Sequence, residues 1–466
     1  MQPKGWRWLQ KLWKALGIDR AIAYTAINRG WTLISGALSL LLISRFLTPV
    51  EQGYYFTFAD ILALQIFFEL GLSTVLVPFA SHEFAHLRWT DRGILEGDTT
   101  AKSRLASLLR FSLLWYGAVA LAVLLFVLPG GILFFSHYHR AGTHVRWEFP
   151  WVWIVLVTSG SLAVTPLLCI LEGCGLIAQI ARLQMQQTIV GTVLFWIALA
   201  LHWGINTAPI TNTVAFLWSG LWVFGAYWRW IKDLWGYPIS YGRVDWKTEI
   251  LPFHWRIALC WLSSYAVLRM FDPILFATHG PVVAGQMGMS LAVMASIAAF
   301  ALSWVTTKSA PFGMLISQQE FEKLDRIFFP TLWQSLIIEM LGGGLFWCGV
   351  VILQRFYPHL GARFLSPLPL LLLVATTVVY HVVNAEWIYL RAHKQEPFLG
   401  IAVLAGLLIA AGSLLLAKPY GALGVMGVYF LVHLVVSFGG GTLIFSKKRS
   451  EWHSSRYSEI SVQTTE

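Results

Sequence analysis

Residues 397–417 read PFLGIAVLAGLLIAAGSLLLA, a run without a single charged side chain. A helix needs about 20 mostly apolar residues to cross the roughly 30 Å hydrocarbon core of a bilayer, so this stretch is long enough to span a membrane. The rest of the chain has the same character, because 57% of its 466 residues are hydrophobic and only 12% are charged. Soluble domains contain about 25% charged residues. The composition therefore excludes a soluble, disordered or nucleic-acid-binding protein and predicts a polytopic helical membrane protein.

Similar apolar runs, separated by polar breaks, predict twelve spans. Because each half then holds an even number of spans, an internal repeat is parallel, with a pseudo-two-fold axis along the membrane normal. The expected fold is all-α, with two six-helix lobes related by this axis. The predicted spans are 22–45, 54–80, 105–135, 151–172, 185–204, 209–231, 257–278, 282–306, 329–352, 366–388, 397–417 and 421–446. The predicted regions are an amphipathic N-terminal segment (1–20), an N-terminal lobe (21–240), a C-terminal lobe (241–446) and a cytoplasmic tail (447–466).

The distribution of Lys and Arg predicts the orientation, because cytoplasmic loops carry an excess of these residues. With twelve spans both termini lie on one side, and the termini and loops of that side contain 24 Lys or Arg. Both termini are therefore expected in the cytoplasm. Residues 3–16 (PKGWRWLQKLWKAL) have the pattern of a helix on an anionic membrane surface; a simple basic topology anchor is the alternative. The opposite loops contain only five such residues: Arg140, Arg146, Arg355, Arg363 and Lys418.

Polar residues recur along one face of three predicted spans. A charged group at the centre of a membrane helix costs about 2.5–3.5 kcal/mol, so polar groups there tend to face a bundle interior or a water-filled cavity. Hydrogen bonding between packed helices is the alternative for any single stripe, whereas three stripes together favour a polar cavity. The stripes are Thr25, Asn28, Thr32, Ser35 and Ser39 in span 1, Thr158, Ser161, Thr165, Cys169 and Glu172 in span 4, and Thr377, His381 and Asn384 in span 10.

Away from its ends, the first span of each half contains one arginine, Arg29 in span 1 and Arg269 in span 7. The predicted two-fold axis brings them to face one another, and the planar guanidinium matches phosphate oxygens, so the pair is a candidate for holding a pyrophosphate. Arg269 is three residues from Asp272, and mutual neutralisation is the alternative. The candidate substrate-binding residues are Arg29, Asn28, Arg269, Thr32, Ser35, His381 and Asn384, and the candidate coupling or gating residues are Asp60, Glu69, Glu172 and Asp272.

Four stretches carry a resemblance to a known family. They are SRFLTPVEQGYYFTFADI (44–61), FELGLSTVLVPFASHEFAHL (68–87), LEGCGLIAQIARLQ (171–184) and, more weakly, FDPILFATHGPVVAGQMGMSLAV (271–293). Together they resemble the polysaccharide-flippase branch of the multidrug/oligosaccharidyl-lipid/polysaccharide exporter superfamily. The acidic-x-Gly pattern of the family is Glu69-Leu70-Gly71 in this sequence, with Glu where Asp is common.

The resemblance implies a flippase that moves undecaprenyl-pyrophosphate-linked oligosaccharide from the inner to the outer leaflet by alternating access, for cell-surface polysaccharide biosynthesis. It implies the bacterial cytoplasmic (inner) membrane, with membrane lipids and a polysaccharide polymerase or assembly machinery as partners. No enzymatic activity and no cofactor are expected, and coupling to H⁺ or Na⁺ is left open. Two alternatives remain: a cation-coupled multidrug exporter of the same superfamily, and a lipid II flippase, although such flippases commonly have fourteen spans.

Two histidine motifs suggest metal binding, which the surrounding sequence does not favour. His82-Glu83-Phe84-Ala85-His86 matches the H-E-x-x-H pattern of zinc proteases, but no convincing third ligand follows it. His137, His139 and His144 lie in one predicted external loop, where solvated side chains are the simpler interpretation. We therefore expect no metal and no catalytic residues.

Overall fold

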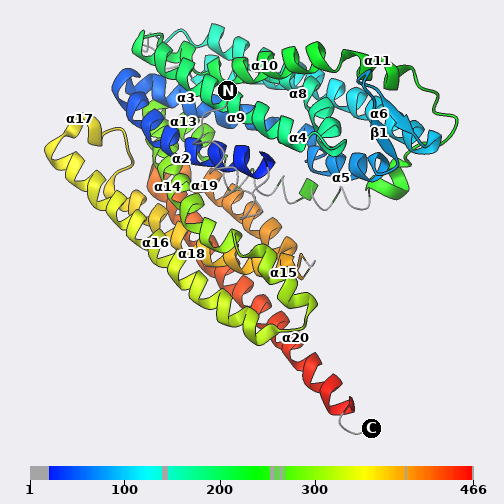
Figure 1. Cartoon of the computed structure of the whole chain (residues 1–466). Helices are drawn as coiled ribbons and strands as arrows, with labels where there is room; N and C mark the ends of the chain where they lie inside the picture. The colour runs from blue at the N-terminus through cyan, green and yellow to red at the C-terminus, as the bar shows by residue number, and fades with distance from the viewer. Residues whose placement is uncertain are drawn as a thin grey trace, which may run out of the picture. The chain divides into compact units, whose positions relative to one another are not determined.

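The computed structural model of the chain describes residues 20–138, 145–251, 269–393 and 396–463, together with a few single residues between 252 and 268 (Figure 1). The expected all-α fold is confirmed. In the described part of the chain, the sole sheet is an antiparallel hairpin of β1 (Leu87–Trp89) and β2 (Leu95–Gly97). The predicted N-terminal segment lies outside the described residues except for Arg20.

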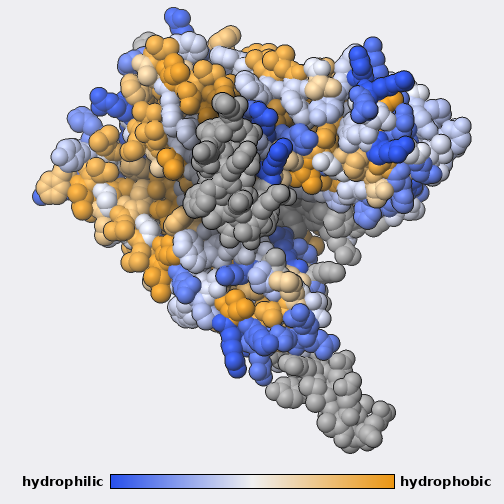
Figure 2. All heavy atoms as spheres, viewed as in Figure 1, coloured by the Kyte–Doolittle hydropathy of each residue, from blue (hydrophilic) through white to orange (hydrophobic). Residues whose placement is uncertain are grey.

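Eight described helices are long and apolar enough to cross a membrane, or nine if one bent pair counts as a span. Many of their large apolar side chains are exposed, for example Leu345 (74%) and Leu415 (73%), and hydrophobic residues cover wide areas of the surface (Figure 2). Contiguous exposed apolar surface of this extent is not tolerated in water. The chain is therefore a multi-pass membrane protein.

Each predicted span overlaps at least one helix of the structure. Three of the twelve predicted spans are missing from this count of helices that are long and apolar enough to cross a membrane. The sixth is only 17 residues long in α10, and the seventh lies partly outside the described residues. The last two predicted spans run together from Leu399 to Trp452. They are separated at Gly421, whose φ of 57° and ψ of −140° interrupt the helix in a backbone region that favours glycine.

The chain folds into two compact units. Unit 1 comprises residues 1–47 and 64–258, and unit 2 comprises residues 48–63 and 259–466. The first part of predicted span 2 thus packs with the second half of the chain, whereas its remainder packs with the first half. The lobe boundaries expected from the sequence (21–240 and 241–446) stay a prediction.

Unit 1 is built around α8. In an apolar 18-residue stretch of this helix 61% of the residues are buried, against 11% in the corresponding stretch of α2. The helix α8 packs against α5, α6 and α10, and α2 packs chiefly against α9. Small residues allow close approach, since a Cβ at Gly173 would lie 2.6 Å from Cβ of Ala80. The helices of unit 1 are α2 (Arg20–Phe46), α4 (Ile66–Glu69), α5 (Ser73–Phe84), α6 (Thr99–Ala122), η2 (Val123–Val127), α7 (Leu128–Tyr138), α8 (Glu148–Gly173), α9 (Ile177–Ala200), η3 (Gly204–Thr207), α10 (Ile210–Ala226), α11 (Trp228–Gly236) and η4 (Trp246–Ile250).

Unit 2 centres on α14, α16 and α18, which pack against one another. One of its core clusters is rich in aromatic residues, with Phe328 and Tyr389 fully buried. The helices of unit 2 are α3 (Pro49–Leu62), α13 (Phe271–His279), α14 (Pro281–Thr306), α15 (Ser309–Ser317), α16 (Phe321–Phe356), α17 (Pro358–Gly361), α18 (Pro367–Ala392), α19 (Leu399–Val432), η5 (His433–Gly440) and α20 (Gly441–Gln463), and η1 (Ala63–Gln65) follows α3 at the unit boundary.

Glycines bring α3 and α14 into backbone contact. A Cβ at Gly53 would lie 1.9 Å from O of Pro281, and one at Gly285 would lie 2.8 Å from N of Gly53. The amide of Gln52 secures the crossing by donating to O of Gly285 (2.8 Å) and O of Arg363 (3.0 Å). Such small-residue packing replaces the hydrophobic effect between membrane helices. It fixes α3 within unit 2.

Predicted span 2 is broken after Glu69. Leu70 (φ 55°) and Gly71 (φ 71°) both have left-handed backbone conformations, which end α4 before α5 begins at Ser73. A left-handed non-glycine residue is strained and persists only where its surroundings hold it. The Glu69-Leu70-Gly71 motif therefore has a structural role as a helix break.

Candidate functional site

Arg29 lies on the exposed polar face of α2 in unit 1. No hydrogen bond or ion pair joins its guanidinium to any residue that the structure describes. The neighbouring polar groups already make hydrogen bonds within α2 or are buried. Thr32 Oγ1 donates to O of Asn28 (2.8 Å), and Ser35 Oγ donates to O of Thr32 (3.5 Å). The side-chain oxygen of Asn28 is buried without a partner. Arg29 is therefore the group on this face with donors available for an anion.

The helix α9 lies beside α2 through Trp196. Its indole Nε1 donates to Oγ of Ser39 (2.8 Å), and its ring lies 5.8 Å from that of Trp31. In the predicted topology spans 1 and 5 run in the same direction, because three spans separate them, so residue 186 of α9 is expected at about the depth of Arg29. Fourteen residues, about four turns, separate Arg182 from Trp196, which places Arg182 on the same side of α9. It lies about one turn from Arg29 in depth.

Sequence reasoning missed Arg182. The predicted spans 151–172 and 185–204 leave it in the loop between them, but α9 begins at Ile177 and includes it as an exposed residue of the helix. Among the described residues it has no ion-pair partner. The signal was present in the motif LEGCGLIAQIARLQ, whose final residues have the polar spacing of a helix face. Unit 1 thus presents two unpaired guanidiniums on adjacent parallel helices.

Glu69 and Glu172 also belong to unit 1. Oε1 of Glu69 accepts hydrogen bonds from Ser73 Oγ (2.8 Å) and from Tyr116 OH (2.9 Å). Glu172 lies half-buried in the last turn of α8. The two hydroxyl donors hold the Glu69 carboxylate next to the break in span 2. The predicted coupling or gating role of both residues stays a prediction.

Arg269 has a different environment in unit 2. Its Nη1 lies 3.0 Å from Oδ1 of Asp60, with 52% of the arginine side chain and 7% of the aspartate side chain exposed. The alternative considered from the sequence was a pair between Arg269 and Asp272, three residues apart. The structure instead pairs the arginine with an aspartate of α3, 209 residues away in the sequence.

Asp272 completes this cluster. Asp272 is 1% exposed, and its carboxyl group lies close enough to that of Asp60 for the two to interact electrostatically. Gly288 makes room for it, because a Cβ at position 288 would lie 2.3 Å from Oδ2 of Asp272. Two adjacent carboxyl groups do not both stay ionised beside a single arginine without a proton or a bound cation. The cluster is therefore suited to binding a small cation.

His381 and Asn384 lie on α18 of unit 2. The imidazole of His381 is buried (3% exposed), and its Nε2 lies 2.8 Å from Oγ of Ser335. Asn384 is half-buried. Their predicted substrate contact stays a prediction, although a histidine enclosed in this way has no free edge for a glycan.

The described residues of the histidine motifs do not form a metal-binding arrangement. Oε1 of Glu83 accepts a hydrogen bond from Nε of Arg104 (2.7 Å), so the glutamate of the H-E-x-x-H pattern is already paired. No group of three metal-ligating side chains occurs among the described residues. His137 lies on α7, whereas His139 and His144 lie outside the described part of the chain.

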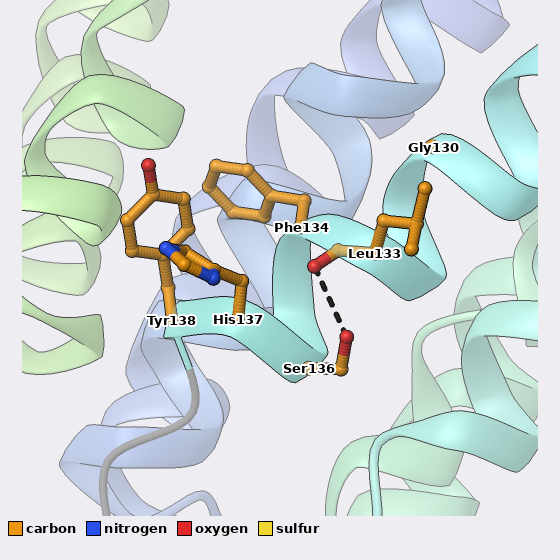
Figure 3. A pocket seen from close by; sticks show the side chains of 6 residues that line it. All are labelled: Gly130, Leu133, Phe134, Ser136, His137 and Tyr138. Atoms are coloured by element: carbon orange, nitrogen blue, oxygen red, sulfur yellow. Dashed lines mark hydrogen bonds between the residues drawn. The ribbon is translucent and has the colours of Figure 1, made fainter.

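A hollow of about 500 Å³ lies along the last turns of α7 (Figure 3). Phe134 and Tyr138 stand side by side in it with ring centroids 5.0 Å apart, and the ring of His137 lies 4.8 Å from that of Tyr138. Of the residues that line it, only His137 belongs to a group singled out in the sequence. The lining residues are Gly130, Leu133, Phe134, Ser136, His137 and Tyr138.

Comparison with solved structures identifies the fold. One match is a multidrug resistance MATE family transporter of the MOP superfamily in an inward-facing conformation, with a TM-score of 0.56 and 14% identity over 89% of this chain and 98% of that one. Another is the lipid II flippase MurJ in an inward closed conformation, with a TM-score of 0.58 and 16% identity over 91% and 87%. No family model and no curated protein matches the sequence. The chain has the fold of these transporters.

Proposed function

We propose that the protein is a flippase that carries undecaprenyl-pyrophosphate-linked oligosaccharide from the inner to the outer leaflet by alternating access. The observation that carries this proposal is the unpaired guanidinium of Arg29 on the polar face of a predicted membrane span. An unpaired charge in a membrane helix is costly and usually functional. A bidentate guanidinium fits phosphate oxygens, so its natural occupant is an anionic headgroup.

Arg182 supplies a second phosphate contact in this proposal. A pyrophosphate carries two phosphoryl groups, and two arginines on the adjacent helices α2 and α9 can each hold one. Thr32 is exposed and Asn28 is half-buried beside Arg29, so we assign these two to the path of the first sugars, whereas Ser35 is buried (4% exposed) and does not join them. The prenyl chain stays in lipid. Arg269, in contrast, is assigned to coupling because Asp60 already occupies it.

The coupling site of the proposed cycle includes Asp60, Asp272 and Arg269. Binding of one H⁺ or Na⁺ between the two carboxyl groups balances the negative charge that Arg269 leaves uncompensated, and loss of this cation restores one excess negative charge in the cluster. Asp60 lies on α3, directly before the broken segment of span 2 that passes from unit 2 to unit 1. Occupancy of the cluster can thereby act on the chain segment that joins the units.

The cellular setting follows from the proposed substrate. The carrier lipid is made in the bacterial cytoplasmic membrane, so we place the protein there with both termini in the cytoplasm. A polysaccharide polymerase or assembly complex is the proposed partner that receives the flipped glycan. Surrounding membrane lipids cover the exposed apolar faces of the helices.

A reconstituted flip assay tests the proposal. Purified protein is placed in proteoliposomes with a labelled undecaprenyl-pyrophosphate oligosaccharide, and its arrival in the opposite leaflet is measured. Arg29→Ala should lower the rate about tenfold or more, because a hydrogen bond to a charged group contributes about 1.5–3 kcal/mol and 1.4 kcal/mol is a factor of ten.

Arg45→Ala is the matched control. Arg45 is an exposed arginine of the same helix, sixteen residues from Arg29 and on the opposite side of the polar stripe. It should retain the normal rate. Equal rates in both variants and in the unmodified protein would remove Arg29 from the binding site.

The multidrug exporter is the second candidate, favoured by the acidic pair of Asp60 and Asp272. A cation exporter should remove cationic dyes from cells and lose this activity when Asp60 is replaced by Asn. Lipid II is the third substrate to test in the same proteoliposomes. Dye efflux without translocation of any lipid-linked sugar would replace the flippase proposal.

A further inference from the structure

A serine, a histidine and a glutamate form a buried polar cluster in the core of unit 2. Ser335 and Glu339 lie one turn apart on α16, and His381 faces them from α18. The Nε2 atom of His381 lies 2.8 Å from Oγ of Ser335, and its Nδ1 lies 3.8 Å from Oε2 of Glu339. The side chains of His381 and Glu339 are 1% and 0% exposed. Both are near the midpoints of predicted spans 9 and 10.

Hydrogen bonding determines which nitrogen of His381 carries the proton. Ser335 has one hydroxyl hydrogen, and it donates this hydrogen to O of Leu332 (2.9 Å). When the hydroxyl hydrogen lies in that bond, the hydroxyl oxygen can only accept from the imidazole, which assigns the proton of His381 to Nε2. Its Nδ1 lone pair then points to the side of Glu339.

Glu339 is the unusual member of the cluster. Neither of its carboxyl oxygens has a hydrogen-bond partner in the part of the chain that the structure describes. An ionised carboxylate without donors in a protein interior is very costly. A single proton resolves this: it rests on the carboxyl group, or it moves to Nδ1 of His381 and leaves an ion pair. Removing it leaves one uncompensated negative charge.

The surroundings contain few groups that could substitute for this proton. The helices α14 and α15, which pack against α16 and α18, have no titratable side chain in their sequences. The other titratable groups of the packed elements have their own contacts or lie toward the helix ends. Glu386 accepts from Thr442 (3.3 Å), and Asp325 pairs with Arg449. His433 contacts Ser437 (3.0 Å) and the rings of Tyr380 and Tyr429. His359 and Arg355 lie at helix ends, Lys447 lies in the first two turns of α20, and Lys418 and Tyr420 lie beside the break of α19 at Gly421.

The geometry also selects among cations. Sodium, like other hard cations, prefers several oxygen ligands, whereas this cluster offers one carboxyl group and an imidazole nitrogen. No third metal-ligating side chain joins them in the described chain. A carboxyl group facing an imidazole lone pair is, however, a complete site for one proton.

We propose that Glu339 and His381 form a proton-binding site within the membrane, separate from the Asp60 cluster, and that its proton is taken up and released during the transport cycle. This inference rests on the proposed function and names its coupling ion. When the proton is bound, α16 and α18 pack around a neutral pair. When it leaves, the buried charge must gain water or a new partner, so the packing of these two helices has to change.

Infrared spectroscopy tests the proton site without any transport. The unmodified protein, reconstituted in liposomes, should show a protonated-carboxyl C=O band that disappears in Glu339→Gln and titrates when the pH is raised. Gln has the same shape and is neutral, so the fold should survive. Thr376→Val is the control, because Thr376 is equally buried on α18 but bonds only to its own helix (2.7 Å to O of Leu372). An unchanged spectrum in Glu339→Gln overturns the proton site.

A flip assay with an imposed proton gradient tests the coupling. Stimulation of the rate by the gradient should be lost in Glu339→Gln and in His381→Gln, and retained in Thr376→Val. Full stimulation in both cluster variants overturns the coupling role. Absence of any lipid-linked translocation by the unmodified protein rejects the proposed function instead, while the infrared result still decides whether Glu339 holds a proton.

Discussion

Arg29 and Arg269 occupy the same position in the sequence pattern of the two halves but differ in the structure. Arg29 in unit 1 has no partner in the described chain, whereas Arg269 in unit 2 is bound to Asp60 at 3.0 Å. An unpaired guanidinium retains all its donors for a ligand, while a paired one holds helices together and responds when its partner is neutralised. The first spans of the two halves therefore place their arginines in two different chemical environments.

The glycines of the two units also differ in whether they touch another helix. Their replacement gives the largest expected effect on the free energy of unfolding. Gly53 on α3 is in backbone contact with α14, whereas Gly30 on α2 has nothing within 4 Å of an added Cβ. Gly53→Ala should lower the free energy of unfolding by about 3 kcal/mol, the upper range for overpacking. Gly30→Ala should raise it by about 0.5–1 kcal/mol, because alanine is the better helix former. Thermal unfolding in detergent measures both, and equal shifts would contradict the close crossing of α3 and α14.

Stability also separates the two arginines. Arg269→Ala should reduce the free energy of unfolding by about 1.5–3 kcal/mol, because it leaves Asp60 buried without its charged donor. Adding Asp60→Asn should restore part of that loss. Arg29→Ala should leave the unfolding temperature unchanged while it lowers flipping. A destabilised Arg29→Ala protein would show that Arg29 has a structural partner.

The smallest effect concerns an ion pair outside the membrane in unit 1. Nη2 of Arg104 lies 2.6 Å from Oε2 of Glu249, which holds the pKa of Glu249 below its ordinary value of 4.5. A carboxyl group with a lowered folded-state pKa stabilises the protein above its unfolded-state pKa, and this contribution is lost as the pH falls through the folded value.

Glu249→Gln tests this pair. Because the pair is partly exposed, its contribution should be less than about 1 kcal/mol. The variant should lose this amount at neutral pH and show no difference from the unmodified protein below the lowered pKa. Unfolding curves measured between pH 3 and 7 check the sign. A loss as large as that of Arg269→Ala would contradict the difference between exposed and buried pairs.

The crossing of α3 and α14 shows how sequence and structure complement each other. Gly53 and Gly285 each lie near the start of an apolar stretch in the sequence, but the sequence alone does not show that these glycines touch. The same holds for Glu69-Leu70-Gly71, whose family pattern is legible while its left-handed backbone is not. Local motifs identify special positions, and long-range packing determines what each position does.

The sequence alone determined the class of protein, its helical spans and the identity of the polar residues inside them. These properties follow from hydrophobicity, which adds up residue by residue along a continuous stretch. Only the tertiary structure decided the partners: Asp60 for Arg269, Ser335 for His381, and none for Arg29 among the described residues. Those contacts join helices far apart in the chain, and their energies depend on distances of a few ångströms that no local pattern records.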